Sequence, residues 1–172
     1  MRNILFLTLL TVFSLTNCDD NELEGGFEMN YIEDFEIFAG LNTLDTHVFE
    51  FTLNSNFQNY LIQKNLTEDN IEAIIPKYVR LTNLSNTLEY NVLYRARLNI
   101  LKTSGELEFE AAYREPIPIN TGFNLELIPT SVEVSEQLKS NQFKLKLKLN
   151  FSEIPSISID TRMFVTFQVV TK

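Results

Sequence analysis

The sequence predicts an all-β protein, an antiparallel β-sandwich of about eight strands with one or two short helices. Three observations predict this class. Several segments alternate apolar and polar residues with a period of two, which is typical of strands with one buried and one solvated face. These segments are short and follow one another at spacings of about 10–20 residues. The stretches with helical periodicity are few and short.

Two strands and a helix are predicted first. Residues 31–38 form the first strand, which Ala39-Gly40 closes. Residues 46–53 form the second, and the period of two places four of its side chains on one face: His47, Phe49, Phe51 and Leu53. Residues 56–64 are predicted to be helical, because Phe57, Tyr60 and Leu61 recur at helical spacing.

Residues 67–84 are predicted to contain a turn and a third strand. Residues 67–70 form a turn or a single helical turn that Thr67 caps. Residues 71–84 are rich in β-formers, but Pro76 cannot donate a backbone hydrogen bond and requires an edge, a bulge or a break.

A hairpin is predicted in the middle of the chain. Residues 88–101 and 107–113 alternate strongly, and residues 102–105 form a four-residue turn between them. In the register that this turn implies, opposed residue numbers sum to about 207. Leu98 then faces Phe109 and Arg97 faces Glu110, so apolar residues meet and opposite charges meet.

The last third of the chain is predicted to contain three more strands and a helix. Residues 116–118 cross between sheets, since Pro116 and Pro118 do not fit a central strand. Strands are predicted at residues 123–128, 143–151 and 157–170, with a short surface helix at residues 131–140.

A leader precedes this domain. Residues 1–17 combine a positive start at Arg2 with an apolar run of about ten residues, well short of the roughly 20 needed to cross a bilayer as a helix. Residues 15–18, Leu-Thr-Asn-Cys, resemble a bacterial lipobox, although Asn17 replaces the usual small residue. We therefore expect a signal peptide at 1–17, a lipid-anchored flexible tether at 18–26 and a single β-sandwich domain at 27–172. The alternative is an unpaired cysteine beside an ordinary cleavage site.

The lipobox interpretation makes Cys18, the only cysteine in the chain, the site of lipidation. The attached lipid would hold the protein at a membrane, and no other cofactor is expected. Without the leader the formal charge changes from −9 to 13 − 23 = −10, which disfavours nucleic acid and anionic lipid surfaces as partners.

Few residues of the domain suggest chemistry. The single histidine, His47, shares a face with phenylalanines and is interpreted as a histidine at the margin of the core. Lys144, Lys146 and Lys148 form a stripe that could attract an anionic glycan or a lipid head, or could be a solvated strand face. The 23 acids allow a hydrolytic carboxylate pair in principle, but no spacing singles one out.

The leader and tether resemble those of small Bacteroidota-type exported lipoproteins. The matching residues are Cys18, Asp19, Asp20, Glu22 and Glu24. The body, at residues 38–43 and 112–114, also looks like uncharacterised members of that group. The resemblance implies an outer-membrane lipoprotein, exported to the cell surface by the acids after the cysteine. A rule from enterobacterial lipoproteins instead makes Asp19 a signal for retention in the inner membrane.

Three functions follow from these observations. The first is a non-enzymatic, lipid-anchored envelope module that binds a protein or a glycan. The second is an envelope hydrolase that uses two carboxylates. The third is a structural accessory of a larger envelope complex, which would expose an apolar patch.

Overall fold

Eight strands, two α-helices and two short 3-10 turns make up the protein in the computed structural model, which describes residues 26–102 and 107–172. The strands are β1 (Phe27–Ile37), β2 (His47–Asn54), β3 (Ile71–Asn83), β4 (Leu93–Lys102), β5 (Glu108–Arg114), β6 (Asn124–Pro129), β7 (Gln142–Phe151) and β8 (Ile159–Thr171). The helices are α1 (Phe57–Lys64) and α2 (Ser135–Leu138), and the 3-10 turns are η1 (Glu68–Asn70) and η2 (Tyr90–Val92).

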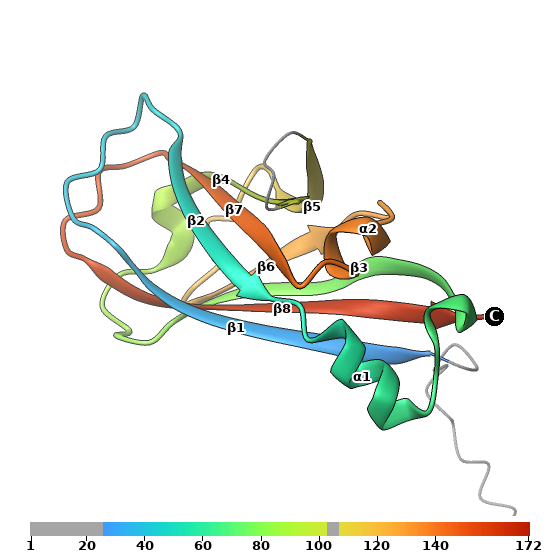
Figure 1. The fold of residues 1–172 in the computed structure, drawn as a ribbon. Coiled ribbons are helices and arrows are strands. Elements are labelled where there is room, and N and C mark those ends of the chain that lie inside the picture. The colour runs from blue at the N-terminus through green and yellow to red at the C-terminus, as the bar shows by residue number, and fades with distance from the viewer. Residues whose placement is uncertain (1–25, 103–106) are drawn as a thin grey trace, which may run out of the picture.

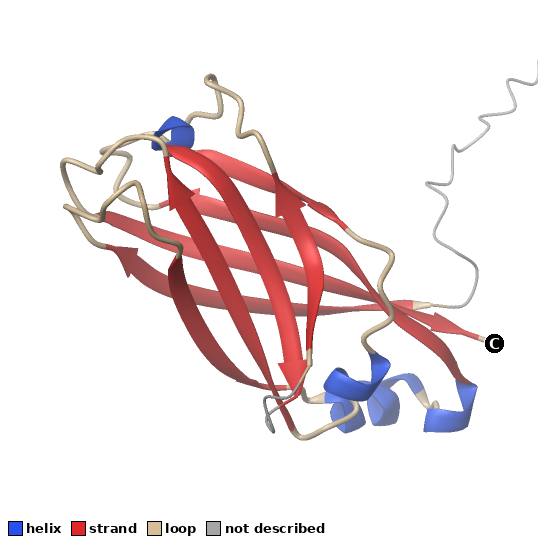
Figure 2. Ribbon diagram, turned by 90° about the horizontal axis from the view of Figure 1, so that it is seen from above, coloured by secondary structure: helices blue, strands red, loops and turns tan. Residues whose placement is uncertain are grey.

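The strands form one antiparallel sheet in the order β1-β8-β3-β6-β5-β4-β7-β2. The sheet folds over at β6, which pairs with β3 over four residues and with β5 only at Ala112–Pro129 and Tyr113–Ile128. One layer therefore holds β1, β8 and β3, and the other holds β5, β4, β7 and β2 (Figures 1 and 2). The predicted all-β antiparallel sandwich is confirmed.

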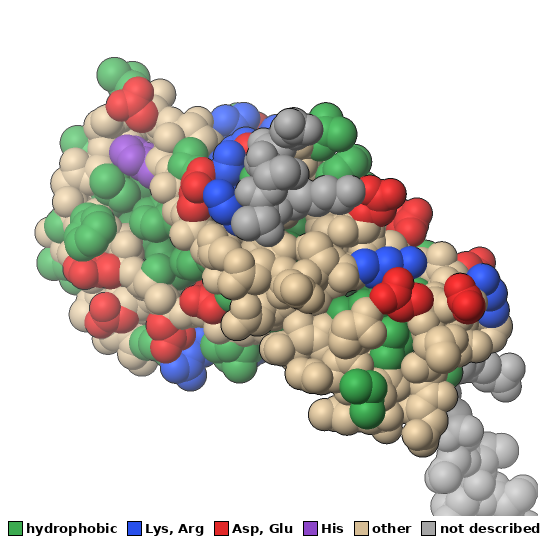
Figure 3. All heavy atoms as spheres, in the orientation of Figure 1, with side chains coloured by type: hydrophobic (Ala, Val, Ile, Leu, Met, Phe, Trp, Pro, Cys, Tyr) green, Lys and Arg blue, Asp and Glu red, His purple; other side chains and the backbone are tan. Residues whose placement is uncertain are grey.

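The molecule has two distinct ends. Because neighbouring strands are antiparallel, the four odd-numbered connections, β1–β2, β3–β4, β5–β6 and β7–β8, all lie at one end, which we call the loop end. Gly26, the helices and Lys172 lie at the opposite end, which we call the tether end (Figures 1 and 2). Hydrophobic side chains gather on the surface toward the loop end in the view of Figure 3.

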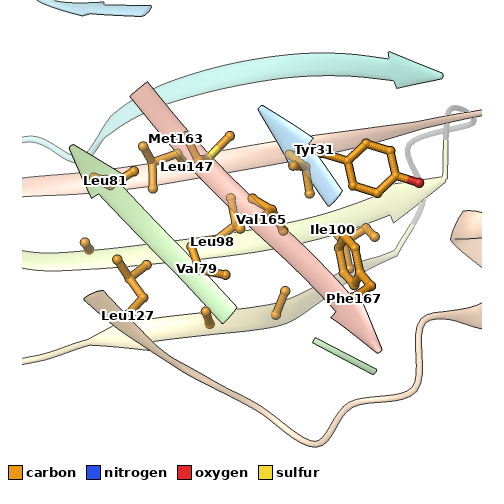
Figure 4. Close-up of a cluster of buried hydrophobic side chains, with 14 of the residues drawn as sticks. Tyr31, Val79, Leu81, Leu98, Ile100, Leu127, Leu147, Met163, Val165 and Phe167 are labelled. Carbon is orange, nitrogen blue, oxygen red and sulfur yellow. The ribbon is translucent and has the colours of Figure 1, made fainter. Parts of the chain in front are cut away.

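The core fills the space between the two layers. Val79 and Leu81 of β3 and Met163, Val165 and Phe167 of β8 point inward and are almost fully buried. They meet side chains of the other layer, among them Leu98, Ile100 and Leu147 (Figure 4). Burying each such side chain contributes about 1.5–3 kcal/mol, so this alternation determines which face of every strand is buried.

β1 and β2 are the two edges of the sheet, and no backbone pairing joins them within the described residues. Aromatic side chains close the gap between them instead. The Phe35 ring lies 5.0 Å from the Phe49 ring and 5.3 Å from the Phe51 ring, centroid to centroid. The Tyr31 hydroxyl donates a hydrogen bond of 2.6 Å to the Ser55 carbonyl. The edges are thus held by side chains.

Several sequence predictions about single elements are confirmed. α1 buries Phe57 and Leu61 as its periodicity predicts. Thr67 caps η1, and its reciprocal partner is Asn70. In β3 the pairing with β8 slips between Pro76 and Tyr78, which is the bulge expected at a proline.

The hairpin of β4 and β5 forms, but the predicted register is wrong. Opposed residue numbers sum to 209 near the turn, as in Ile100–Phe109, and to 210 farther out, as in Leu98–Ala112. The change occurs at a bulge, where Ala111 has no opposed residue in β4. Most of the predicted turn lies outside the described residues.

The predicted surface helix at 131–140 is also wrong in extent and burial. α2 spans only four residues, and Ser135, Gln137 and Leu138 are buried. The segment packs on β3, where the Val134 amide donates to the Ile74 carbonyl and the Ile74 amide donates to Ser135 Oγ. These bonds to a distant strand replace the helical bonds that a longer helix would have.

Candidate functional site

The lysine stripe lies on the outer face of β7. Leu145, Leu147 and Leu149 point into the core, so the alternation turns Lys144, Lys146 and Lys148 outward. β7 is flanked by β2 and β4, and each neighbour presents its own polar face beside the lysines.

Carboxylates on other strands contact two of these lysines. Glu108 of β5 accepts hydrogen bonds from Lys146 Nζ at 2.7 Å and from Lys148 Nζ at 2.5 Å, and it reaches over β4 to do so. Glu50 of β2 lies 3.3 Å from Lys146 Nζ. The hydrogen bonds from Lys146 and Lys148 lower the pKa of Glu108 to about 2. The hydrogen bond to Glu108 also raises the pKa of Lys146.

These contacts alter the predicted ligand site. An anionic glycan or lipid head at Lys146 or Lys148 would have to compete with an ionised carboxylate that is already in place. The arrangement fits a cross-strand ion-pair network over β2, β7, β4 and β5. Binding at Lys144, Lys146 and Lys148 stays a prediction.

A second network lies on the outer face of β4. Arg97 contacts Glu115 at 3.2 Å and Glu110 at 3.5 Å, and Arg95 lies 3.8 Å from Glu115. The Tyr94 hydroxyl donates to Glu115 at 2.8 Å. The hydrogen bonds from Tyr94 and Arg97 lower the pKa of Glu115. Although the predicted register is wrong, the Arg97–Glu110 ion pair forms.

The carboxylates do not form a pair suited to glycoside hydrolysis in these networks. A general acid needs a raised pKa, whereas cations and hydrogen bonds lower the pKa of Glu108 and Glu115. Glu33 has a raised pKa, caused by desolvation and by the charge of Asp34. Adjacent strand residues point to opposite faces, however, and Asp34 is held by Arg162 through two bonds of 2.7 Å, so these two acids cannot flank one bond.

His47 has a structural environment. Its Nε2 lies 2.9 Å from the Asn42 carbonyl oxygen, and its ring stands edge-on to Phe151 at 5.4 Å between centroids. This geometry confirms the interpretation of a histidine at the margin of the core. Among the residues that the structure describes, no group of three or more His, Cys, Asp or Glu side chains is placed to hold a metal ion.

Three of the clefts in the described part of the protein contain at most one carboxylate each. The largest of these three, about 370 Å³, lies at the tether end beside Gly26 and contains Glu28, which Lys77 binds at 2.5 Å. A cleft of about 270 Å³ contains Arg114 and Glu126. A third of about 240 Å³ lies between the start of α1 and residues 139–141 and is lined mainly by amide and hydroxyl side chains. None of these three holds two carboxylates.

The predicted lipidation and export residues lie outside the described residues. These are Cys18, Asp19, Asp20, Glu22 and Glu24. In the part of the chain that is described, no helix has the length and apolar character needed to cross a membrane.

Sequence reasoning missed Glu50 and Glu115 as members of the networks. The alternation of β2 turns Glu50 outward, but its partner Lys146 is almost a hundred residues away in the chain. Glu115 follows the last residue of β5, where the bulge at Ala111 has already changed the register. No local pattern carries that information.

Comparisons with known proteins identify no family. No protein-family model matches the chain, and no curated protein sequence matches it. A decameric BFDV capsid protein structure is similar over 84% of this chain and 98% of that chain, with 9% identity and a TM-score of 0.39. A Desmodium yellow mottle tymovirus structure covers 85% of this chain and 88% of its own, with 10% identity and a TM-score of 0.26. At these TM-scores the two likenesses carry no argument about this protein.

Proposed function

We propose that this protein is a lipid-anchored module of the bacterial cell envelope that binds a partner there without catalysing a reaction. The observation that carries the proposal is the sequence Leu15-Thr16-Asn17-Cys18 at the end of a short apolar leader. Acyl chains on Cys18 would add about 0.8 kcal/mol of membrane affinity per buried CH₂, and more than one chain gives stable anchoring.

The position of Gly26 supports an anchor at the tether end. A Cβ atom at residue 26 would clash with the Val169 carbonyl oxygen, so the backbone of Gly26 passes closer to β8 than a residue with a side chain could. Gly26 follows Cys18 by eight positions in the chain (26 − 18 = 8), and eight extended Cα-to-Cα steps span at most about 27 Å. An anchor at Cys18 would keep the tether end near the membrane.

The ion pairs of the strand carboxylates support a binding role without catalysis. The strand networks tie Glu108, Glu110 and Glu115 to cations, which suits a stable surface better than proton transfer. The single histidine, His47, also forms a hydrogen bond with a backbone carbonyl group, that of Asn42. An outer-membrane, surface-exposed location is part of the proposal and derives from the acids Asp19, Asp20, Glu22 and Glu24.

Labelling with an alkyne fatty acid tests the anchor. Wild type, Cys18→Ala and the leader control Ser14→Ala would be produced in a bacterium that processes lipoproteins. We expect wild type and the control to carry the label and to partition into detergent, whereas Cys18→Ala carries none. An unlabelled wild-type protein, or a Cys18→Ala variant that keeps its label, would refute the proposal.

A further inference from the structure

The loop end has an unusual composition. Its four loops are residues 38–46, 84–92, 115–123 and 152–158, and none of them contains a lysine or an arginine. They contain four acids: Asp45, Glu89, Glu115 and Glu153. Arg95 and Arg97 of β4 balance the charge of Glu115, but the four loops contain no lysine or arginine to balance the other three acids, which gives this end a negative local charge.

The same loops expose apolar side chains. Six of the 13 large apolar residues that are exposed in the described part of the protein lie on them: Phe38, Leu44, Leu84, Ile119, Ile154 and Ile157. Leu44 is 92% exposed and Ile119 is 88% exposed. Single exposed apolar residues are ordinary, but a group of them at one end indicates an interaction surface.

Hydrogen bonds hold three of these loops together. The Gly40 amide donates to the Pro155 carbonyl at 2.9 Å, and the Ala39 amide donates to Ser158 Oγ at 3.2 Å. The Ser152 amide donates to the Val92 carbonyl at 2.9 Å, which joins the loop 84–92 to the loop 152–158. The apolar side chains at residues 38, 84, 154 and 157 are therefore parts of one connected surface, and Figure 3 shows hydrophobic side chains gathered there.

Arg114, the last residue of β5, lines a cleft with residues 118, 120 and 121 of the third loop, but two other basic residues near this end are engaged with other groups. Arg162 forms two bonds to Asp34, and Arg95 contacts Glu115 and Asn150. In contrast, Glu36 of β1 lies opposite Asp160 of β8, so two like charges face each other at the base of the loops. The loop end thus combines exposed apolar side chains with acids in excess of the available cations.

We infer that the loop end docks onto a protein whose surface has an apolar depression bordered by lysine and arginine side chains. This inference rests on the proposed anchoring at Cys18, which would leave the loop end pointing away from the membrane. A cationic rim complements the acids, and apolar side chains such as Leu44 and Ile154 supply the buried centre of an interface.

Other occupants fit less well. An anionic lipid surface would be repelled by the acids of the four loops. In a symmetric dimer through this surface, each acidic patch would face its own copy, which like-charge repulsion disfavours.

Photo-crosslinking in intact cells of the source organism tests the inference with the full-length chain. A benzophenone amino acid would replace Leu44 or Ile154, and Ile62, which is 73% exposed on α1 at the tether end, is the matched control position. We expect a discrete adduct with another protein from positions 44 and 154 and none from position 62. Peptide mapping should place the crosslink beside lysine or arginine residues of that partner.

Charge reversal at the loop end provides the second arm. Asp45→Lys together with Glu153→Lys should reduce the adduct at least about fivefold, because like charges would then face each other across the interface. Glu72→Lys, an exposed acid of β3, should leave the adduct unchanged. All variants should keep the melting temperature of the parent.

Three crosslinking results would overturn the inference: no adduct from either loop position, an equal yield of adduct from position 62, or an adduct with lipid or with a second copy of the chain. An adduct whose yield is unchanged by the charge-reversal substitutions would also overturn it. The fatty-acid label on the same samples separates the two proposals. A labelled protein without adducts refutes only the docking surface, and an unlabelled protein refutes the anchor.

Discussion

At the scale of single residues, Glu108 connects more of the structure than any local pattern suggests. Its carboxylate accepts from Lys146 and Lys148 of β7 and from the side-chain amide of Asn99 of β4, at 3.1 Å in the last case. One acid on β5 therefore ties together three strands of the same layer. Because the site is partly exposed, solvent screening limits the contribution of this network to about 1 kcal/mol.

The lowered pKa of Glu108 predicts a pH dependence of stability. The contribution of Glu108 should be complete above its ordinary pKa of 4.5 and should fall as the pH decreases toward its folded pKa of about 2. Glu108→Gln should thus lower the free energy of unfolding by about 0.5–1 kcal/mol at pH 7 and by clearly less at pH 3.

Urea titrations at the two pH values measure this effect. Glu72→Gln, an exposed acid on β3, is the control and should change the free energy of unfolding little at either pH. An effect of Glu108→Gln that is the same at pH 7 and pH 3 would argue that the ion pairs contribute no stability.

At the scale of elements, α1 provides a test of how the helix is held. Leu61 is 2% exposed and belongs to the core, whereas its neighbour Ile62 is 73% exposed. Leu61→Ala should lower the free energy of unfolding by about 2–4 kcal/mol, because it removes buried methyl groups and leaves a cavity. Ile62→Ala should change it by less than about 0.5 kcal/mol. Equal effects in chemical denaturation would contradict the described packing.

The strands show which structural features sequence alternation can predict: it predicts the buried face of a strand, but not the strand register. The alternation in β7 and β8 correctly identifies the buried residues, such as Leu147 and Val165, because burial has the same period as the strand. The register of the β4–β5 hairpin is not contained in that alternation, since a shift of two residues keeps every side chain on its face. The bulge at Ala111 then adds one more residue.

α2 illustrates a second limit. The spacing of Val134 and Leu138 fits a helix, and both residues are buried. The segment nevertheless forms only one helical turn, because Val134 and Ser135 bond to Ile74 on a strand about 60 residues earlier. Such long-range competition for backbone groups has no local signal. The loop end was missed for the same reason: its four loops are far apart in sequence and meet only through the strand order.

At the scale of the whole molecule, the end that carries the anchor determines which surface faces away from the membrane. The strands run between the tether end and the loop end, so β1, with 11 residues, separates them by about 36 Å. A lipid on Cys18 would place the helices and Gly26 toward the membrane and the acidic, apolar loop end away from it. Both proposals therefore depend on the chemistry of one cysteine.

Mass spectrometry of the mature protein, isolated from the membranes of its source organism, is the most direct test of that chemistry. We expect a polypeptide of 172 − 17 = 155 residues that begins at Cys18 and carries additional mass from a glyceryl group and fatty acyl chains. A mature protein with an unmodified Cys18, or one that begins at another residue, would contradict it.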